Sequence, residues 1–139
     1  MSRSKFVEID CPECGLKQEV SIWESINVTV DPDLKEKLFQ GRINVLQCQK
    51  CGIESFIPAP LMYHDMRKKF CVQFYPFNWL ELDDFLQNFT KEGGLNIGFF
   101  KLLKYSKYFK WTHIVFDMNE FVRYVIFRDK LQEKWEMAS

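Results

Sequence analysis

The sequence has no net charge, very little histidine and no long apolar run. Its 19 basic residues balance its 19 acidic residues, and only two histidines occur among 139 residues. Charge alone therefore attracts the chain neither to nucleic acid nor to an anionic membrane. No apolar run is long enough to span a bilayer, and the first ten residues lack an apolar core of signal-peptide length. We expect a cytoplasmic protein with no membrane partner.

The motifs of common catalytic sites are also missing. The chain contains no His-Glu-x-x-His motif, no glycine-rich phosphate loop and no Gly-x-Ser-x-Gly elbow. His64 precedes Asp65, but neighbouring residues of a strand face opposite ways, so the two do not make a ready acid-base pair. His113 has apolar neighbours, and the carboxylates of residues 81–84 are typical of a solvated helix start. We predict no catalytic residue, with an enzyme or an iron-based electron carrier kept as an alternative.

Cysteine is well represented, and four of the five cysteines form two copies of Cys-x-x-Cys-Gly. These two turns, called knuckles below, contain Cys11 and Cys14 in the first copy and Cys48 and Cys51 in the second. A metal clamp, a redox dithiol and a pair of disulfides compete as explanations. Thiols stay reduced in the cytosol unless a metal holds them, and a redox dithiol needs a single Cys-x-x-Cys that opens a helix. Paired knuckles instead match a closed tetrahedral site of four thiolates.

The metal interpretation carries further expectations. We predict structural Zn²⁺ bound by all four knuckle cysteines, with no open position for water; iron has a similar ligand pattern, which the spacing does not distinguish. Backbone amides of each tight turn should point at the sulfurs, and Gly15 and Gly52 should take the positive φ that the turn requires. The fifth cysteine, Cys71, has no partner knuckle and is interpreted as a small buried hydrophobic residue.

Hydrophobic periodicity gives a coarse secondary structure. Residues 20–30 alternate with period two, which predicts a strand or hairpin arm, and 31–41 should form a short helix with Asp31 as its cap, Pro32 at its first position and Gly41 at its end. We further expect a strand over 43–48, a strand end and a crossing loop over 54–66, and a strand within 68–77. Helices are expected over 78–94, over 96–111 and from Asp117 onward. Asp117 and Glu120 form a capping-box pattern.

These elements predict an α+β protein. Residues 1–60 should form a zinc-ribbon-like, antiparallel β half with a helical insertion, and residues 61–139 an aromatic-rich half of a strand plus helices, the two packed as one unit. The aromatic content of 17% indicates either a core rich in rings or an apolar face for a partner. We therefore predict a non-enzymatic interaction module that binds a protein partner or forms a homo-oligomer.

One segment supports an alternative function. Four lysines without an acid alternate with aromatic residues between 99 and 111; they are Lys101, Lys104, Lys107 and Lys110, accompanied by Tyr105 and Trp111 among others. Lysines that follow phosphates beside rings that stack on bases are typical of single-strand binding. The segment also fits an amphipathic helix with buried rings and solvated lysines, which the zero net charge favours. Nucleic-acid binding through the ribbon and these residues stays the alternative.

Several stretches together resemble the bacterial CpXC domain family. They are "CPECG" at 11–15, "VDPDLKEKLFQGRINVLQCQKCG" at 30–52, "PAPLMYHD" at 58–65 and "FRDKL" at 127–131. The resemblance implies that Cys11, Cys14, Cys48 and Cys51 are metal ligands, and it names no catalytic residue. The second knuckle reads Cys-Gln-Lys-Cys and lacks the proline of the family's namesake motif. Because proline presets the turn without supplying a ligand, this departure leaves the implied metal binding intact.

Overall fold

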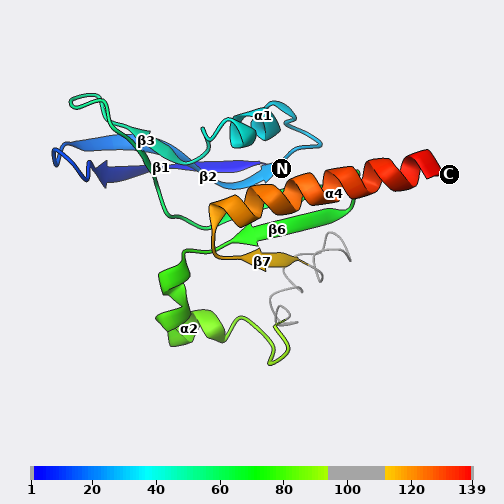
Figure 1. Ribbon diagram of the computed structural model, residues 1–139. Coiled ribbons are helices and arrows are strands. Elements are labelled where there is room, and N and C mark those ends of the chain that lie inside the picture. Colours follow the sequence, from blue (N-terminus) through cyan, green and yellow to red (C-terminus); the bar gives the residue numbers. More distant parts are fainter. Residues whose placement is uncertain (1, 94–111, 139) are drawn as a thin grey trace.

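A mixed five-stranded sheet with a long helix across it forms the centre of the molecule (Figure 1), described here from a computed structural model for residues 2–93 and 112–138. The elements are β1 (Arg3–Asp10), β2 (Lys17–Asn27), α1 (Asp33–Phe39), β3 (Val45–Gln47), β4 (Glu54–Phe56), β5 (Leu61–Asp65), β6 (Phe70–Phe74), the 3-10 helix η1 (Phe77–Glu81), α2 (Asp83–Leu86), β7 (His113–Val115) and α4 (Met118–Ala138). The large sheet has the order β1-β2-β5-β6-β7, and β3 and β4 form a separate two-stranded sheet. The predicted α+β class is confirmed.

Strand pairing joins the early and late parts of the chain. β1 and β2 pair in antiparallel fashion, as do β5 and β6 and as do β3 and β4. The β2–β5 and β6–β7 pairs are parallel. Parallel neighbours need a long crossover between them, and the crossover from β2 to β5 contains α1 and the entire β3–β4 hairpin. The second knuckle therefore lies outside the main sheet, in the segment that connects β2 to β5.

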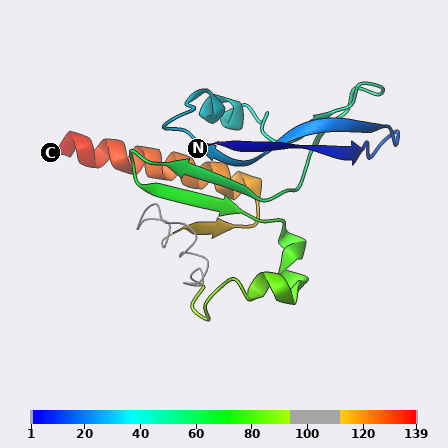
Figure 2. The ribbon, with the colours of Figure 1, turned by 180° about the vertical axis from the view of Figure 1, so that it is seen from behind.

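The main hydrophobic core lies between α4 and one face of the sheet (Figures 1 and 2). Phe121 and Val125 of α4 are fully buried there, against side chains such as Tyr63 of β5 and Val72 of β6. Complete burial of side chains of this size contributes about 1.5–3 kcal/mol each. The buried residues of this core all lie outside the knuckles.

A second, smaller cluster surrounds the knuckles. Its buried members are Cys11, Ile22, Leu46, Cys48 and Ile57. The cluster lies between the β1–β2 and β3–β4 hairpins. Five buried side chains, two of them cysteines, form a small core for two hairpins, and small cores of this kind usually need a disulfide or a metal.

The helix between the knuckles forms as the sequence predicts. α1 begins at Asp33 directly after Pro32, buries Leu34 and Leu38 on one face, and is followed by Gly41 at φ +71°. The backbone carbonyl of Asp31 accepts a bond of 3.1 Å from the Leu34 amide, although no side chain caps the helix. The prediction of Asp31 as the cap and Pro32 as the first helical residue is therefore wrong by one position, because Pro32 itself is the N-cap.

Two segments differ from the expectation. Residues 61–65, predicted as part of a crossing loop, form β5, because Leu61, Tyr63 and Asp65 alternate inward and the strand inserts between β2 and β6. The helix predicted over 78–94 is replaced by the short helices η1 and α2, with Leu82 extended between them at φ −95° and ψ 117°. The packing of rings explains this break, since Trp79, Phe85 and Phe89 all contact Tyr75.

The C-terminal helix begins at the predicted position and has one of the two interactions of the predicted capping box. The carboxylate of Asp117 accepts the backbone N–H groups of Asn119 at 2.7 Å and Glu120 at 3.3 Å. The Glu120 side chain does not complete a capping box but pairs with Arg123 at 2.8 Å. The helix predicted over 96–111 lies outside the described residues. Within the described part of the chain, no helix combines the length and apolarity required to cross a bilayer.

Candidate metal centre

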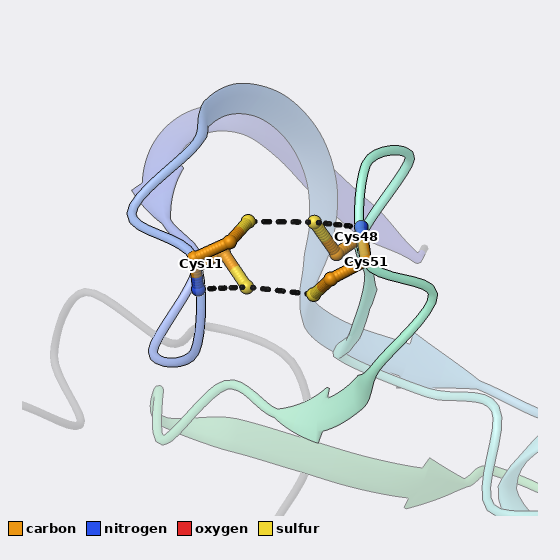
Figure 3. Close-up of side chains that lie close together, drawn as sticks. Cys11, Cys48 and Cys51 are labelled. Carbon is orange, nitrogen blue, oxygen red and sulfur yellow. Dashed lines mark hydrogen bonds between the residues drawn. The ribbon is translucent and has the colours of Figure 1, made fainter.

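The four knuckle cysteines converge on one point. The first knuckle is the turn between β1 and β2, and the second is the turn between β3 and β4. The sulfurs of Cys11 and Cys51 are 3.5 Å apart, as are those of Cys14 and Cys48. All four sulfurs lie within 4.8 Å of one another. Figure 3 shows Cys11, Cys48 and Cys51 pointing toward a common centre from the two facing turns.

Both knuckles have the same backbone geometry. The Cys14 amide lies 3.5 Å from the Cys11 sulfur, and the Cys51 amide lies 3.5 Å from the Cys48 sulfur. The amides of Gly15 and Gly52 donate to the carbonyls of the first cysteine in each turn, at 2.9 and 3.0 Å. These glycines have φ values of +76° and +77°, in the left-handed region that glycine favours. The predicted amide directions and glycine conformations are confirmed.

The sulfur arrangement fits a tetrahedral metal ion. Four sulfurs at the usual Zn–S bond length of about 2.3 Å stand about 3.8 Å apart at the corners of a tetrahedron. Two observed separations are 3.5 Å and all four sulfurs lie inside 4.8 Å, so the observed range includes that value. All four residues are free cysteines. The described chain therefore contains a preformed group of four thiols of the right size for one ion.

Local hydrogen bonds prepare two of the sulfurs for metal binding. The Cys51 amide lowers the pKa of Cys48 to about 6, against an ordinary value of 9.0. The Cys14 amide likewise lowers the pKa of Cys11. A hydrogen bond to the charged form stabilises a thiolate, and the thiolate is the form that binds metal. The amide hydrogen bond therefore favours the metal-binding thiolate at the first cysteine of each knuckle.

The part of the chain that contains both knuckles matches one protein family. A comparison with protein families matches residues 9–136 to the family described as CpXC protein. The chain belongs to the CpXC family. The match begins just before the first knuckle and extends through most of α4, so it includes both knuckles, the β3–β4 hairpin and the main sheet except for most of β1. Searches of curated proteins and of solved structures found no match.

Two side-chain amides fix the position of the knuckle hairpins in this CpXC protein. Asn44, before β3, accepts the Trp23 amide at 2.7 Å and donates to the Trp23 carbonyl at 3.0 Å. Gln18, at the start of β2, donates to the Gln47 carbonyl at 3.1 Å and accepts the Gln49 amide at 3.3 Å. Each side-chain amide donates one hydrogen bond to the backbone and accepts one from it, as a residue of a neighbouring strand would. Neither residue is predicted from the sequence, because single polar side chains produce no periodic signal.

The other residues singled out by the sequence are distant from this centre or outside the described part. The proposed nucleic-acid contacts Lys101, Lys104, Tyr105, Lys107, Lys110 and Trp111 lie outside the described residues. Cys71 is buried on β6, as predicted, and its sulfur is 2.9 Å from the Thr112 hydroxyl. Burial raises the pKa of Cys71 to about 11, so this thiol is not prepared for nucleophilic chemistry. Burial also lowers the pKa of His64, to about 4.

Proposed function

We propose that this CpXC chain is a non-enzymatic interaction module whose two knuckle hairpins are held together by one structural Zn²⁺. The proposed ligands are Cys11, Cys14, Cys48 and Cys51. The observation that carries the proposal is the convergence of four sulfurs from two separate hairpins within 4.8 Å. Four thiolates fill a tetrahedral coordination shell and leave no position for water or substrate, which makes the ion structural.

The small size of the knuckle cluster supports a structural metal. Its five buried residues hold together two hairpins that are separate in sequence. In such a unit the free energy of metal binding becomes folding free energy. Zinc is preferred over iron because the proposed role is mechanical and Zn²⁺ has no redox chemistry to control.

An exposed apolar row on α4 supports the interaction role. Phe127, Leu131 and Trp135 are four residues apart and are 56%, 37% and 66% exposed. Residues at this spacing lie on one face of a helix. The C-terminal part of α4 projects beyond the sheet (Figures 1 and 2), so the sheet does not cover this face. The proposed partner is a protein with an apolar groove that accepts one helix face, since aromatic side chains commonly anchor such contacts.

The metal part is tested by elemental analysis of the chain purified without added metal. The expected result is one zinc per chain in the wild type and in Cys71→Ser, and a large loss of zinc in Cys48→Ser. Cys71→Ser is the matched control because it removes a buried cysteine that lies outside the cluster. Stoichiometric iron, or a Cys48→Ser protein that keeps the wild-type zinc content, would contradict the proposal.

The docking part is tested by a photo-crosslinking amino acid placed on α4 in living cells. A probe at Leu131 should give one discrete crosslinked product that disappears when Phe127 and Trp135 are replaced by glutamine. A probe at Glu133, which is exposed two residues further along the helix, should give little or none of it. Equal products from both positions, or none from Leu131, would count against a docking role for this face.

A further inference from the structure

Two sulfur contacts of 3.5 Å run between the two knuckles. Cys11 lies 3.5 Å from Cys51, and Cys14 lies 3.5 Å from Cys48. Each contact joins a buried sulfur to a more accessible one. Cys11 and Cys48 are each 3% exposed, whereas Cys51 is exposed and Cys14 is half-buried. The cluster therefore contains two cross-knuckle pairs, each with one side open to solvent reagents.

We propose that the cluster is also an oxidation site at which hydroperoxides form two specific disulfides, Cys11–Cys51 and Cys14–Cys48. In the first step the accessible Cys51 sulfur attacks hydrogen peroxide and loses its proton, giving a Cys51 sulfenic acid and water. The buried Cys11 thiol then attacks the sulfenic sulfur, and the new S–S bond forms as water leaves. Each disulfide consumes one peroxide and transfers two electrons to it. Cys14 and Cys48 react in the same way, with Cys14 as the accessible sulfur.

The backbone supports cross-knuckle pairing. A disulfide needs an S–S distance of about 2.05 Å, so each pair must approach by about 1.5 Å. The hairpins are already held in facing positions by the Asn44–Trp23 and Gln18–Gln47 hydrogen bonds. Within each knuckle the amide of the second cysteine points at the sulfur of the first.

The consequence is a covalent substitute for the metal clamp. The proposed disulfides connect residues that are 40 and 34 positions apart in sequence, on opposite hairpins. Disulfides that close long loops restrict the unfolded chain more than those that close a two-residue turn. The oxidised chain should therefore keep its two hairpins together after the metal ion has been released. This inference depends on the sulfur geometry and not on the identity of the metal.

Disulfide mapping of the full-length chain tests the proposal. The purified protein is treated with hydrogen peroxide, the remaining thiols are alkylated under denaturing conditions, and the peptides are assigned by mass spectrometry. None of the five cysteines is in a disulfide before the treatment. After it, only Cys71 should be alkylated, and the linked peptides should be Cys11–Cys51 and Cys14–Cys48. Linkage within the knuckles, as Cys11–Cys14 and Cys48–Cys51, or oxidation to sulfinic acids without disulfides, would overturn the proposal.

A matched pair of double variants separates the specific pairing from general thiol oxidation. Cys11→Ser/Cys51→Ser leaves Cys14 and Cys48, which should still form a disulfide. Cys11→Ser/Cys48→Ser leaves Cys14 and Cys51, which belong to different proposed pairs. These two should form at least tenfold less disulfide. Both variants remove two ligands and keep one cysteine per knuckle, so loss of metal affects them alike. Equal yields would overturn the pairing. Zinc content, measured before oxidation, tests the proposed function separately.

Discussion

The Asp129 carboxylate on α4 lies 2.7 Å from the Lys35 ammonium on α1. Its other oxygen is 2.8 Å from Lys68, in the turn between β5 and β6. These side chains are partly buried, with exposures of 15% for Asp129, 27% for Lys35 and 21% for Lys68. One carboxylate thus connects the helix between the two knuckles, the central sheet and the C-terminal helix.

Replacement of Asp129 by asparagine should destabilise the protein. The change leaves two partly buried ammonium groups without their counter-charge, and a charged hydrogen bond contributes about 1.5–3 kcal/mol. We expect the free energy of unfolding to fall by about 2 kcal/mol, measured by urea denaturation at low salt. Glu133→Gln, on the exposed face of the same helix, is the control and should change it by less than about 0.5 kcal/mol. Equal effects of the two substitutions would show that the ion pairs contribute nothing specific.

Replacement of Asn44 should loosen the second knuckle hairpin. Asn44 is 3% exposed, has φ +56° and makes two hydrogen bonds to the Trp23 backbone. Asn44→Ala leaves both Trp23 groups unpaired and places alanine at positive φ, so we expect a loss of about 2–4 kcal/mol. Asn44→Gly removes the same hydrogen bonds but tolerates the conformation, and should lose about 1 kcal/mol less. Urea unfolding of the zinc-saturated proteins measures both, and a fully stable Asn44→Ala would contradict this role.

Replacement of Gly15 should weaken metal binding through the backbone alone. A Cβ atom at Gly15 would meet no atom within 4 Å, but φ there is +76°. Holding alanine in the left-handed region costs about 1–2 kcal/mol, which corresponds to about 5–30-fold in affinity. Competition with a chromogenic zinc chelator measures the change. Gly15→Asn should lose less, because asparagine visits this region more readily; the opposite order would exclude backbone strain as the cause.

Acid should destabilise the fold through His64. Burial lowers the pKa of this β5 residue to about 4, whereas its ordinary value is 6.5. Between these values the unfolded chain binds a proton that the folded chain does not, so stability is present above the higher pKa and is lost as the pH falls. As the pH is lowered from about 7 to about 5, the urea concentration at the unfolding midpoint of the wild type should fall. The midpoint of His64→Gln should fall less over the same pH range. Parallel pH profiles of the two proteins would exclude His64 as the cause.

The local features of this protein were predictable because short segments encode them. Two Cys-x-x-Cys-Gly turns specify their own backbone, with positive φ at Gly15 and Gly52. The period of apolar residues and the signals at Pro32 and Asp117 specify α1 and the start of α4. Residues within one or two turns of each other decide these features, so no distant contact is needed to find them.

The tertiary structure decided which distant segments meet. Residues 61–65 became a strand because β2 and β6 offer hydrogen bonds on both sides, which outweighs the signal of the nearby prolines. The positioning role of Asn44 depends on Trp23, 21 residues earlier. The sequence by itself determined that four thiols lie in two turns. Only the packing of one hairpin against the other determined that Cys11 faces Cys51 and that Cys14 faces Cys48, since pairing across a gap of 34 or more residues depends on long-range contacts.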